Sequence, residues 1–408
     1  MDKMLHQKAI NYLNYFCKGV KDRSVGSPGN RKATKFFYNT LKELGWQTNI
    51  QKFDAFDWEN GGARLEADSE KFEVYVSPYS LGCNERAELK AASNIEELEN
   101  GDFNDKILLL YGEIAKEQLM PKNFVFYNPA EHQKIISLLE ESGVKAIITA
   151  TDRNAALAGG VYPFPLIEDG DFDIPSVYLT AENGRKLLTY EGQTITLKSN
   201  SKRIAGPGYN VIGVKGKNLF QQNAAQRIVI TAHIDAKKGS PGAIDNATGV
   251  ALLLILAELL KNYDGSKLIE LVAFNGEDYY SVPGQMAYIK ANQDNFDNIL
   301  LNINIDGAAY KIGKTSFSTF DLEPSLEERV EEIVEAHSGL VKGSNWVQGD
   351  HSIFLQYGAP AVAISSKWFI DNIDTQQITH TKKDNLEIVD THKIVEIAEA
   401  LNQLLRKI

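Results

Sequence analysis

The stretch that decides the fold runs from Thr231 to Gly249 and reads TAHIDAKKGSPGAIDNATG. The residues just before it, Arg227–Thr231 (RIVIT), are largely β-branched and apolar, which is typical of a buried strand in a parallel sheet. This run leads to His233 and Asp235, and a helix-like run, Gly249–Leu260, follows the loop. The order of strand, polar loop and helix predicts an open α/β sheet with functional groups at the carboxyl end of the strand.

Two further strand-like runs end in the same way. Leu268–Phe274 (LIELVAF) leads to Asn275–Asp278, and Ile299–Ile305 (ILLNINI) leads to Asp306. His380 follows a later apolar stretch. Because functional groups in an open α/β sheet gather beyond the carboxyl ends of the strands, we expect these side chains to converge despite their separation in sequence.

The residue types in these segments are those that bind divalent metals. His233 offers a neutral nitrogen ligand, and Asp235, two residues on, is placed to hold the imidazole in one tautomer. A structural role is the alternative for each acidic residue. Asp245 or Asn246 could satisfy the free amides at the start of the helix, and Asp306 could belong to a simple turn.

The segment Gly349–Phe354 (GDHSIF) leaves a similar choice open. Asp350 and His351 either support a metal or substrate or only begin a helix. His380 taken by itself is also compatible with a structural role.

Together these segments resemble a known family, the co-catalytic di-zinc aminopeptidases, which are relatives of the glutamate carboxypeptidases and glutaminyl cyclases. They span almost the whole chain in the order expected of that family. The segments that carry the resemblance are GSPGNRKATKFFYNTLKELGW (26–46), HID (233–235), GAIDNATG (242–249), NGED (275–278), NIDG (304–307), GDHSIF (349–354) and HTKKD (380–384).

The resemblance implies a site for two zinc ions, whose ligands are His233, Asp245, Asp278, Asp306 and His380. His233 and Asp306 complete one site, Asp278 and His380 complete the other, and Asp245 bridges both. Two divalent ions about 3.5 to 4 Å apart need a shared carboxylate to offset their repulsion, which agrees with a bridging aspartate. The resemblance also implies a cis peptide bond directly after Asp245.

The implied reaction is removal of the amino-terminal residue from a peptide that has a free amino terminus. Glu277 is the implied general base, which takes a proton from a water held between the metals. Where the family usually has a second glutamate, this chain has Asp278, which is shorter by one methylene. We therefore expect the second metal site to be the weaker one. Cobalt and manganese are the expected substitutes for zinc.

The pattern of the chain changes between residues 56 and 207. This region contains an α/β-like arrangement that includes a helix-like run at Glu131–Glu141, and Asp173–Leu188 resembles the protease-associated domain inserted in many members of the same family. The expected fold is a three-layer α/β/α catalytic domain with a mainly parallel or mixed central sheet. The predicted division is a discontinuous catalytic domain, 1–55 with 208–408, and a smaller inserted domain, 56–207.

Composition narrows the classes of partner. The net charge of −11 argues against a nucleic-acid or anionic-membrane surface and is compatible with a cationic substrate, such as a peptide amino terminus. The sequence contains no apolar run near the roughly 18 residues that span a bilayer, and its first residues lack the apolar segment of a signal peptide. With only Cys17 and Cys83 present, we expect a reducing, cytoplasmic location.

Two other classes of function stay open on the sequence. A carboxypeptidase or a glutaminyl cyclase shares the fold, and the cyclase needs only one metal. A catalytically inactive relative that serves as a binding module is the second class, although every ligand type and Glu277 are retained.

Overall fold

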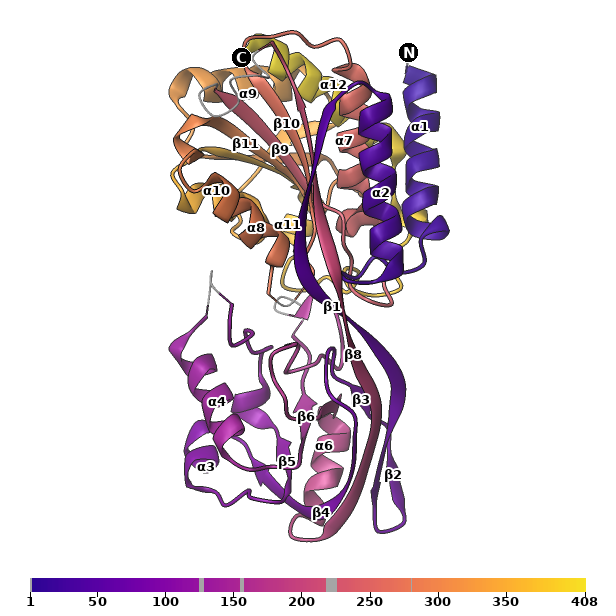
Figure 1. The fold of residues 1–408 in the computed structure, drawn as a ribbon, viewed down its shortest axis with the longest axis vertical. Coiled ribbons are helices and arrows are strands. Elements are labelled where there is room, and N and C mark those ends of the chain that lie inside the picture. Colours follow the sequence, from indigo (N-terminus) through magenta and orange to yellow (C-terminus); the bar gives the residue numbers. More distant parts are fainter. Residues whose placement is uncertain (1, 125–127, 155–157, 218–225, 280) are drawn as a thin grey trace. The chain divides into compact units, whose positions relative to one another are not determined.

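The structure is a computed structural model that describes residues 2–124, 128–154, 158–217, 226–279 and 281–408 (Figure 1). The chain divides into two compact units, one formed by Met1–Ala55 with Pro207–Ile408 and the other by Phe56–Gly206. Two long strands, β1 (Gln47–Ala67) and β8 (Thr194–Lys215), contain residues of both units. All the candidate metal ligands belong to the first unit.

The first unit is built on a mixed sheet with the order β13-β12-β14-β11-β9-β10-β8. Its central strands β14, β11, β9 and β10 are parallel, while β8 and β12 pair antiparallel with β10 and β14. The strands that belong to this unit alone are β9 (Arg227–His233), β10 (Leu268–Phe274), β11 (Ile299–Ile305), β12 (Thr315–Phe320), β13 (Leu340–Lys342) and β14 (Ala361–Ser366). His233 pairs with Phe274 in the register, so β9 and β10 end at the same level.

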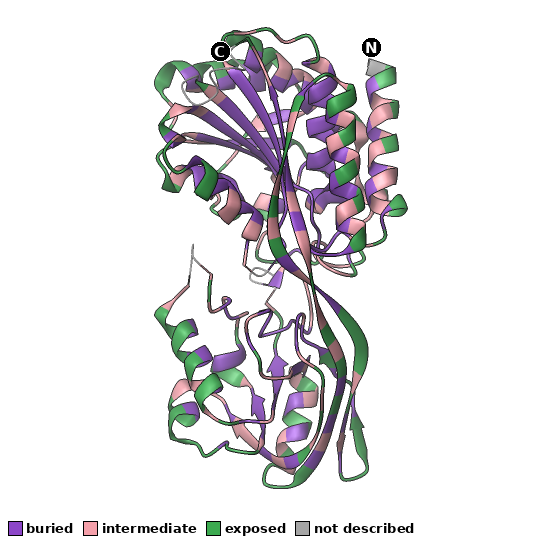
Figure 2. Ribbon diagram, viewed as in Figure 1, coloured by how far each residue is buried: buried purple, intermediate pink, exposed green. Residues whose placement is uncertain are grey.

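Helices cover both faces of this sheet, as the expected three-layer fold requires (Figure 1). One layer contains α1, α2, α7 and α12, and the other contains α8 and α10. The helices of the unit are α1 (Asp2–Asn14), α2 (Pro28–Glu43), α7 (Thr248–Leu259), α8 (Pro283–Asn292), α9 (Pro324–Ala336), α10 (His351–Gln356), α11 (Lys367–Asp371) and α12 (Thr391–Lys407), with short turns η1 (Tyr15–Gly19), η5 (Ala243–Ala247), η6 (Phe296–Asn298) and η7 (Leu386–Ile388). Because both faces are covered, the central strands are buried along nearly their whole length (Figure 2).

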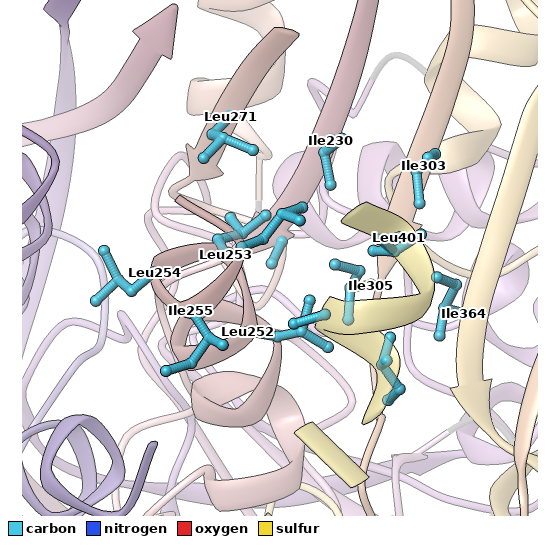
Figure 3. Close-up of a cluster of buried hydrophobic side chains, with 14 of the residues drawn as sticks. Ile230, Leu252, Leu253, Leu254, Ile255, Leu271, Ile303, Ile305, Ile364 and Leu401 are labelled. Atoms are coloured by element: carbon cyan, nitrogen blue, oxygen red, sulfur yellow. The ribbon is translucent and has the colours of Figure 1, made fainter. Parts of the chain in front are cut away.

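The core of the unit is organised around α7. Its sequence, TGVALLLILAEL, is apolar on every side, and the residues from Thr248 to Glu258 are all buried. A helix that is apolar all round must be enclosed by other elements, and α1, α2 and α12 pack against α7. Figure 3 shows Leu252, Leu253, Leu254 and Ile255 of α7 in a cluster with apolar side chains of β9, β10, β11, β14 and α12. This packing fixes the amino-terminal end of α7, which directly follows Asp245 and its turn.

The second unit is a smaller α/β structure. Within it the strand order is β8-β4-β5-β6-β7-β3, in which β4, β5, β6 and β7 are parallel. The helix expected at residues 131–141 is present as α4, which confirms that prediction. The elements of the unit are β2 (Glu70–Phe72), β3 (Tyr75–Val76), β4 (Cys83–Ala92), α3 (Ile95–Asn100), β5 (Ile107–Leu110), η2 (Gly112–Ala115), α4 (Ala130–Glu141), β6 (Ala146–Thr151), β7 (Ser176–Thr180), α6 (Ala181–Leu187) and η3 (Leu188–Tyr190). Its likeness to a protease-associated domain stays a prediction.

Among the described residues, no helix combines the length and apolar character that a membrane crossing demands.

Candidate metal centre

The five candidate ligands converge at the carboxyl ends of the parallel strands. His233 is the last residue of β9, and Asp306 directly follows β11. Asp278 lies in the loop that follows β10. Asp245 lies in the turn η5, and His380 lies in the loop between α11 and η7. The fold therefore brings together side chains that are far apart in the sequence, from His233 to His380.

The ligands form two groups that share Asp245. In the first group, His233 Nε2 lies 3.1 Å from Asp245 Oδ1 and 3.5 Å from Asp306 Oδ1. In the second group, His380 Nε2 lies 3.2 Å from Asp245 Oδ2 and 3.0 Å from Asp278 Oδ1. Within each group the three donor atoms lie within 4.8 Å of one another. The two oxygens of Asp245 thus face different histidines, which is the arrangement of a bridging carboxylate.

The chemistry of these residues fits two divalent metal ions. The side chain of His233 is 1% exposed, and neither of its ring nitrogens has a hydrogen-bond partner. Leaving a buried nitrogen without a partner costs about 1 to 3 kcal/mol, and a cation between this nitrogen and the facing carboxylates would remove that cost. Imidazole nitrogen and carboxylate oxygen are also the ligands that zinc takes in catalytic sites.

The charges of the cluster shift the titration of its histidines. Burial opposes protonation of His233, but the carboxylates of Asp306, Asp235 and Asp245 outweigh burial and raise the pKa of His233 well above its usual value. Burial likewise opposes protonation of His380, and Asp278 and Asp245 raise the pKa of His380 well above its usual value. Without metal, both imidazoles therefore hold protons that a metal ion must displace.

Asp245 shows the opposite effect. Burial disfavours the charged carboxylate, but the neighbouring imidazoles of His233 and His380 outweigh burial and lower the pKa of Asp245 below its usual value. The Asp245 side chain is therefore a carboxylate at neutral pH, as a bridging ligand must be.

Asp235 does not make the contact that we expected. Its Oδ1 lies 3.7 Å from His233 Nδ1, which is too long for a hydrogen bond. Its two oxygens instead accept hydrogen bonds from the backbone amides of Gly276, at 2.8 Å, and Asp278, at 2.9 Å. Asp235 therefore shapes the loop that carries Glu277 and Asp278, and it reaches His233 only through its charge.

Glu277 lies beside the two groups and belongs to neither. Its side chain is half-buried, and burial raises the pKa of Glu277 well above its usual value. The carboxylates of Asp306, Asp278 and Asp350 raise this pKa further, while His233 acts in the opposite direction. A carboxyl group beside the ligands that is not itself a ligand, and whose pKa is raised toward the working pH, is suited to general base catalysis.

Asp278 reaches the second group in spite of its short side chain. Its Oδ1 faces His380, while its Oδ2 accepts a hydrogen bond from the backbone amide of Lys237 at 3.0 Å. One oxygen is therefore directed toward a metal, and the other is held by the loop that follows β9.

The start of α7 separates the two roles that the sequence left open for Asp245 and Asn246. Asn246 Oδ1 accepts a hydrogen bond from the Gly249 amide at 3.1 Å, and Asn246 Nδ2 donates to the Ile305 carbonyl at 2.7 Å. The peptide bond between Asp245 and Asn246 is cis, which confirms that prediction. Asn246 therefore satisfies the helix start, and the Asp245 carboxylate is directed toward the histidines.

Asp384 is a site residue to which the sequence assigned no role. It is fully buried, and its two oxygens accept hydrogen bonds from the amides of Ile244, at 2.7 Å, and Asp245, at 3.0 Å. Burial, together with the charge of Asp245, raises the pKa of Asp384 to about 7. The only signal in the sequence was its position in HTKKD, four residues after His380.

Asp350 and His351 lie at the start of α10, but the Asp350 side chain does not cap this helix. Asp350 Oδ1 accepts a hydrogen bond from Gln285 Nε2 at 2.8 Å, and its Oδ2 has no hydrogen-bond partner. His351 Nε2 lies 2.9 Å from the Trp346 carbonyl. Asp350 therefore contacts α8, and His351 contacts the segment that precedes α10.

Comparison with known proteins identifies relatives of this chain. Residues 210–405 match Peptidase family M28. Aminopeptidase YwaD of Bacillus subtilis (strain 168) is 21% identical over 416 residues, which cover 96% of this chain and 82% of that protein. This agrees with the resemblance to the co-catalytic zinc aminopeptidases, which is confirmed.

Two solved structures share the fold. An aminopeptidase from Aneurinibacillus sp. strain AM-1 has a TM-score of 0.75 and 21% identity, with 98% of this chain and 93% of that chain covered. BSAP, a zinc aminopeptidase from Bacillus subtilis, has a TM-score of 0.74 and 18% identity, with 98% of this chain and 95% of that chain covered. The expected α/β fold with a mixed central sheet is therefore confirmed.

Metal binding is predicted to release protons. Carboxylates raise the pKa values of His233 and His380, so both rings are protonated at neutral pH without metal, whereas a ring nitrogen must be neutral to bind one. The apparent affinity for zinc should therefore fall as the pH is lowered from about 8 to about 6. Calorimetric titration in two buffers with different ionisation enthalpies measures the protons released, and equal heats in both buffers would contradict the raised pKa values.

Proposed function

We propose that this chain, whose residues 210–405 match Peptidase family M28, is a zinc-dependent aminopeptidase that holds two ions. The observation that carries the proposal is the division of the Asp245 carboxylate between two ligand groups. Its Oδ1 lies 3.1 Å from His233 Nε2, and its Oδ2 lies 3.2 Å from His380 Nε2. A single ion would not require a second histidine and a second aspartate on the far oxygen of the same carboxylate.

The proposed metal sites use the two groups already described. His233 and Asp306 would hold one ion, Asp278 and His380 would hold the other, and Asp245 would bridge them. When bound, two divalent ions lower the pKa of a water and polarise a scissile carbonyl. Cobalt and manganese are proposed as substitutes for zinc, because carboxylate and imidazole ligands also suit these ions.

Glu277 is proposed to move the proton during hydrolysis. It neighbours the ligand Asp278 but lies outside both ligand groups, so its carboxylate is free to accept a proton. Bound cations would favour the ionised form of Glu277, because a positive charge nearby stabilises a carboxylate. The Glu277 carboxylate would accept a proton from the attacking water and return it to the departing amine of the peptide.

The proposed substrate is a peptide with a free amino terminus. The net charge of −11 and the acidic residues of the site favour a positively charged group over an anionic one. This consideration favours an aminopeptidase over a carboxypeptidase, whose substrate presents a carboxylate. We also propose a cytoplasmic location, because Cys17 and Cys83 are both free thiols.

A glutaminyl cyclase is the second candidate function, because it would use the same fold with a single ion. The second ligand group makes this candidate the weaker one, since Asp278 and His380 approach within 3.0 Å of each other beside Asp245. An inactive binding protein would have no use for a base at Glu277. Assaying the purified chain with a panel of aminoacyl p-nitroanilides, carboxyl-terminal peptide substrates and glutaminyl peptides distinguishes these functions.

Glu277→Gln is predicted to lower kcat by about 10² to 10⁴-fold while zinc binding stays nearly unchanged. Glutamine keeps the shape of the side chain but cannot accept the proton. The measurement is hydrolysis of the best aminoacyl p-nitroanilide with zinc present, together with a zinc titration of the same preparation. Glu328→Gln, the same change at an exposed position of α9, is the control and should leave kcat unchanged. Near-wild-type turnover in E277Q would remove Glu277 from the mechanism.

The two zinc sites are predicted to differ in affinity. The second group depends on Asp278, which is one methylene shorter than glutamate and has one oxygen engaged by the Lys237 amide. Titration of metal-free protein should therefore show one tight and one weaker equivalent. Asp278→Glu is expected to tighten the weaker equivalent only. The control is Asp297→Glu in η6, which lies at the opposite end of β11 from Asp306.

Two equivalents of equal affinity in the wild-type protein would contradict this inequality. They would indicate that the position of the loop after β10 compensates fully for the shorter side chain.

A further inference from the structure

Arg23 is a buried arginine whose guanidinium donates four hydrogen bonds to backbone carbonyls. It lies between η1 and α2 and is 3% exposed. Its Nε donates to Ile234 O at 3.1 Å, its Nη1 to Phe16 O at 3.0 Å and to Pro241 O at 2.9 Å, and its Nη2 to Gly242 O at 2.7 Å. A buried charge is costly unless it is well hydrogen-bonded, so these four contacts define the position of the guanidinium closely.

Three of the accepting carbonyls belong to the loop that joins two metal ligands. Ile234 directly follows His233, and Gly242 lies three residues before Asp245. Arg23 therefore binds both the beginning and the end of this loop. The fourth carbonyl belongs to Phe16, whose side chain is part of the main hydrophobic core, so the loop is tied to a rigid part of the unit.

A side chain of α2, Asn30, holds the backbone of Arg23 in place. Asn30 Nδ2 donates to the Arg23 carbonyl at 2.8 Å. Asn30 and Asn275 also exchange two side-chain hydrogen bonds, each of 2.8 Å. Asn275 begins the loop that carries Glu277 and Asp278, so the segment from Arg23 to Asn30 contacts two of the loops that carry site residues.

The contact between Arg23 and the loop requires a glycine at position 242. Its φ is +57°, a conformation that residues with a side chain rarely adopt. A Cβ atom at this position would lie 2.8 Å from Arg23 Nη2 and 2.5 Å from the Asp245 carbonyl oxygen. The close approach of the guanidinium to the turn before Asp245 therefore depends on the missing side chain.

We propose that Arg23 is a positioning residue for the bridging ligand: by binding both ends of the loop between His233 and Asp245, its guanidinium sets where the Asp245 carboxylate stands relative to His233. This rests on the proposed two-metal function. Lysine cannot replace this arrangement, because its single ammonium nitrogen cannot span carbonyls at both ends of the loop. Since Asp245 serves both ligand groups, its displacement would affect both metal sites.

The test is Arg23→Lys in the full chain, with circular dichroism as the check of folding. Zinc affinity is measured by competition with a chelator, and the visible absorption spectrum of the cobalt-loaded protein reports the coordination geometry. We expect both zinc affinities to fall by about 10 to 100-fold, as they do when residues that orient metal ligands are changed. The cobalt spectrum should change, and kcat should fall more than KM rises.

The matched control is Arg329→Lys. Arg329 is exposed and donates to the carbonyl of Lys407 at 2.6 Å, so it makes the same kind of contact away from the ligand groups. It should leave the metal affinities, the cobalt spectrum and the kinetics unchanged.

Zinc affinities within about twofold of the wild-type values in a folded R23K variant, with an unchanged cobalt spectrum, would overturn the proposal. If R23K does not fold, Arg23→Gln is measured in the same way. Failure of both variants to fold would also overturn it, because Arg23 would then support the whole unit and not the ligand loop. Wild-type protein that binds no zinc would overturn the proposed function and this inference together, so the two failures are distinguishable.

Discussion

The constraint on which the site depends is that one carboxylate must face two histidines from opposite oxygens. Asp245 satisfies this constraint because it lies in the turn η5, directly before the deeply buried helix α7. The apolar surface of α7 fixes the helix against the sheet, and Asn246 closes the helix start by bonding to Gly249 and Ile305. The position of the Asp245 carboxylate is therefore set by the hydrophobic core as much as by polar contacts.

Hydrogen bonds from buried backbone amides to two aspartates position the loops that carry the candidate ligands. The Asp235 side chain accepts hydrogen bonds from the backbone amides of Gly276 and Asp278. The Asp384 side chain accepts hydrogen bonds from the backbone amides of Ile244 and Asp245. In each pair a carboxylate from one loop fixes the backbone of another, so the loops of the site hold one another.

Three of the five candidate ligands could be predicted from the position of apolar runs, because each lies just beyond such a run and parallel strands end at one edge of a sheet. His233, Asp278 and Asp306 are of this kind. The partners of Asp235 could not be predicted in this way, since they are backbone amides, which every residue has. The contacts of Arg23 and Asp384 could not be predicted for the same reason, since they too are made with backbone groups.

The most direct test of the central claim is anomalous diffraction at the zinc edge from crystals of the zinc-loaded protein. We predict two peaks about 3.5 to 4 Å apart, with Asp245 bound to both and one histidine on each. A single peak, or two peaks of which only one contacts Asp245, would contradict the bridging role of this carboxylate.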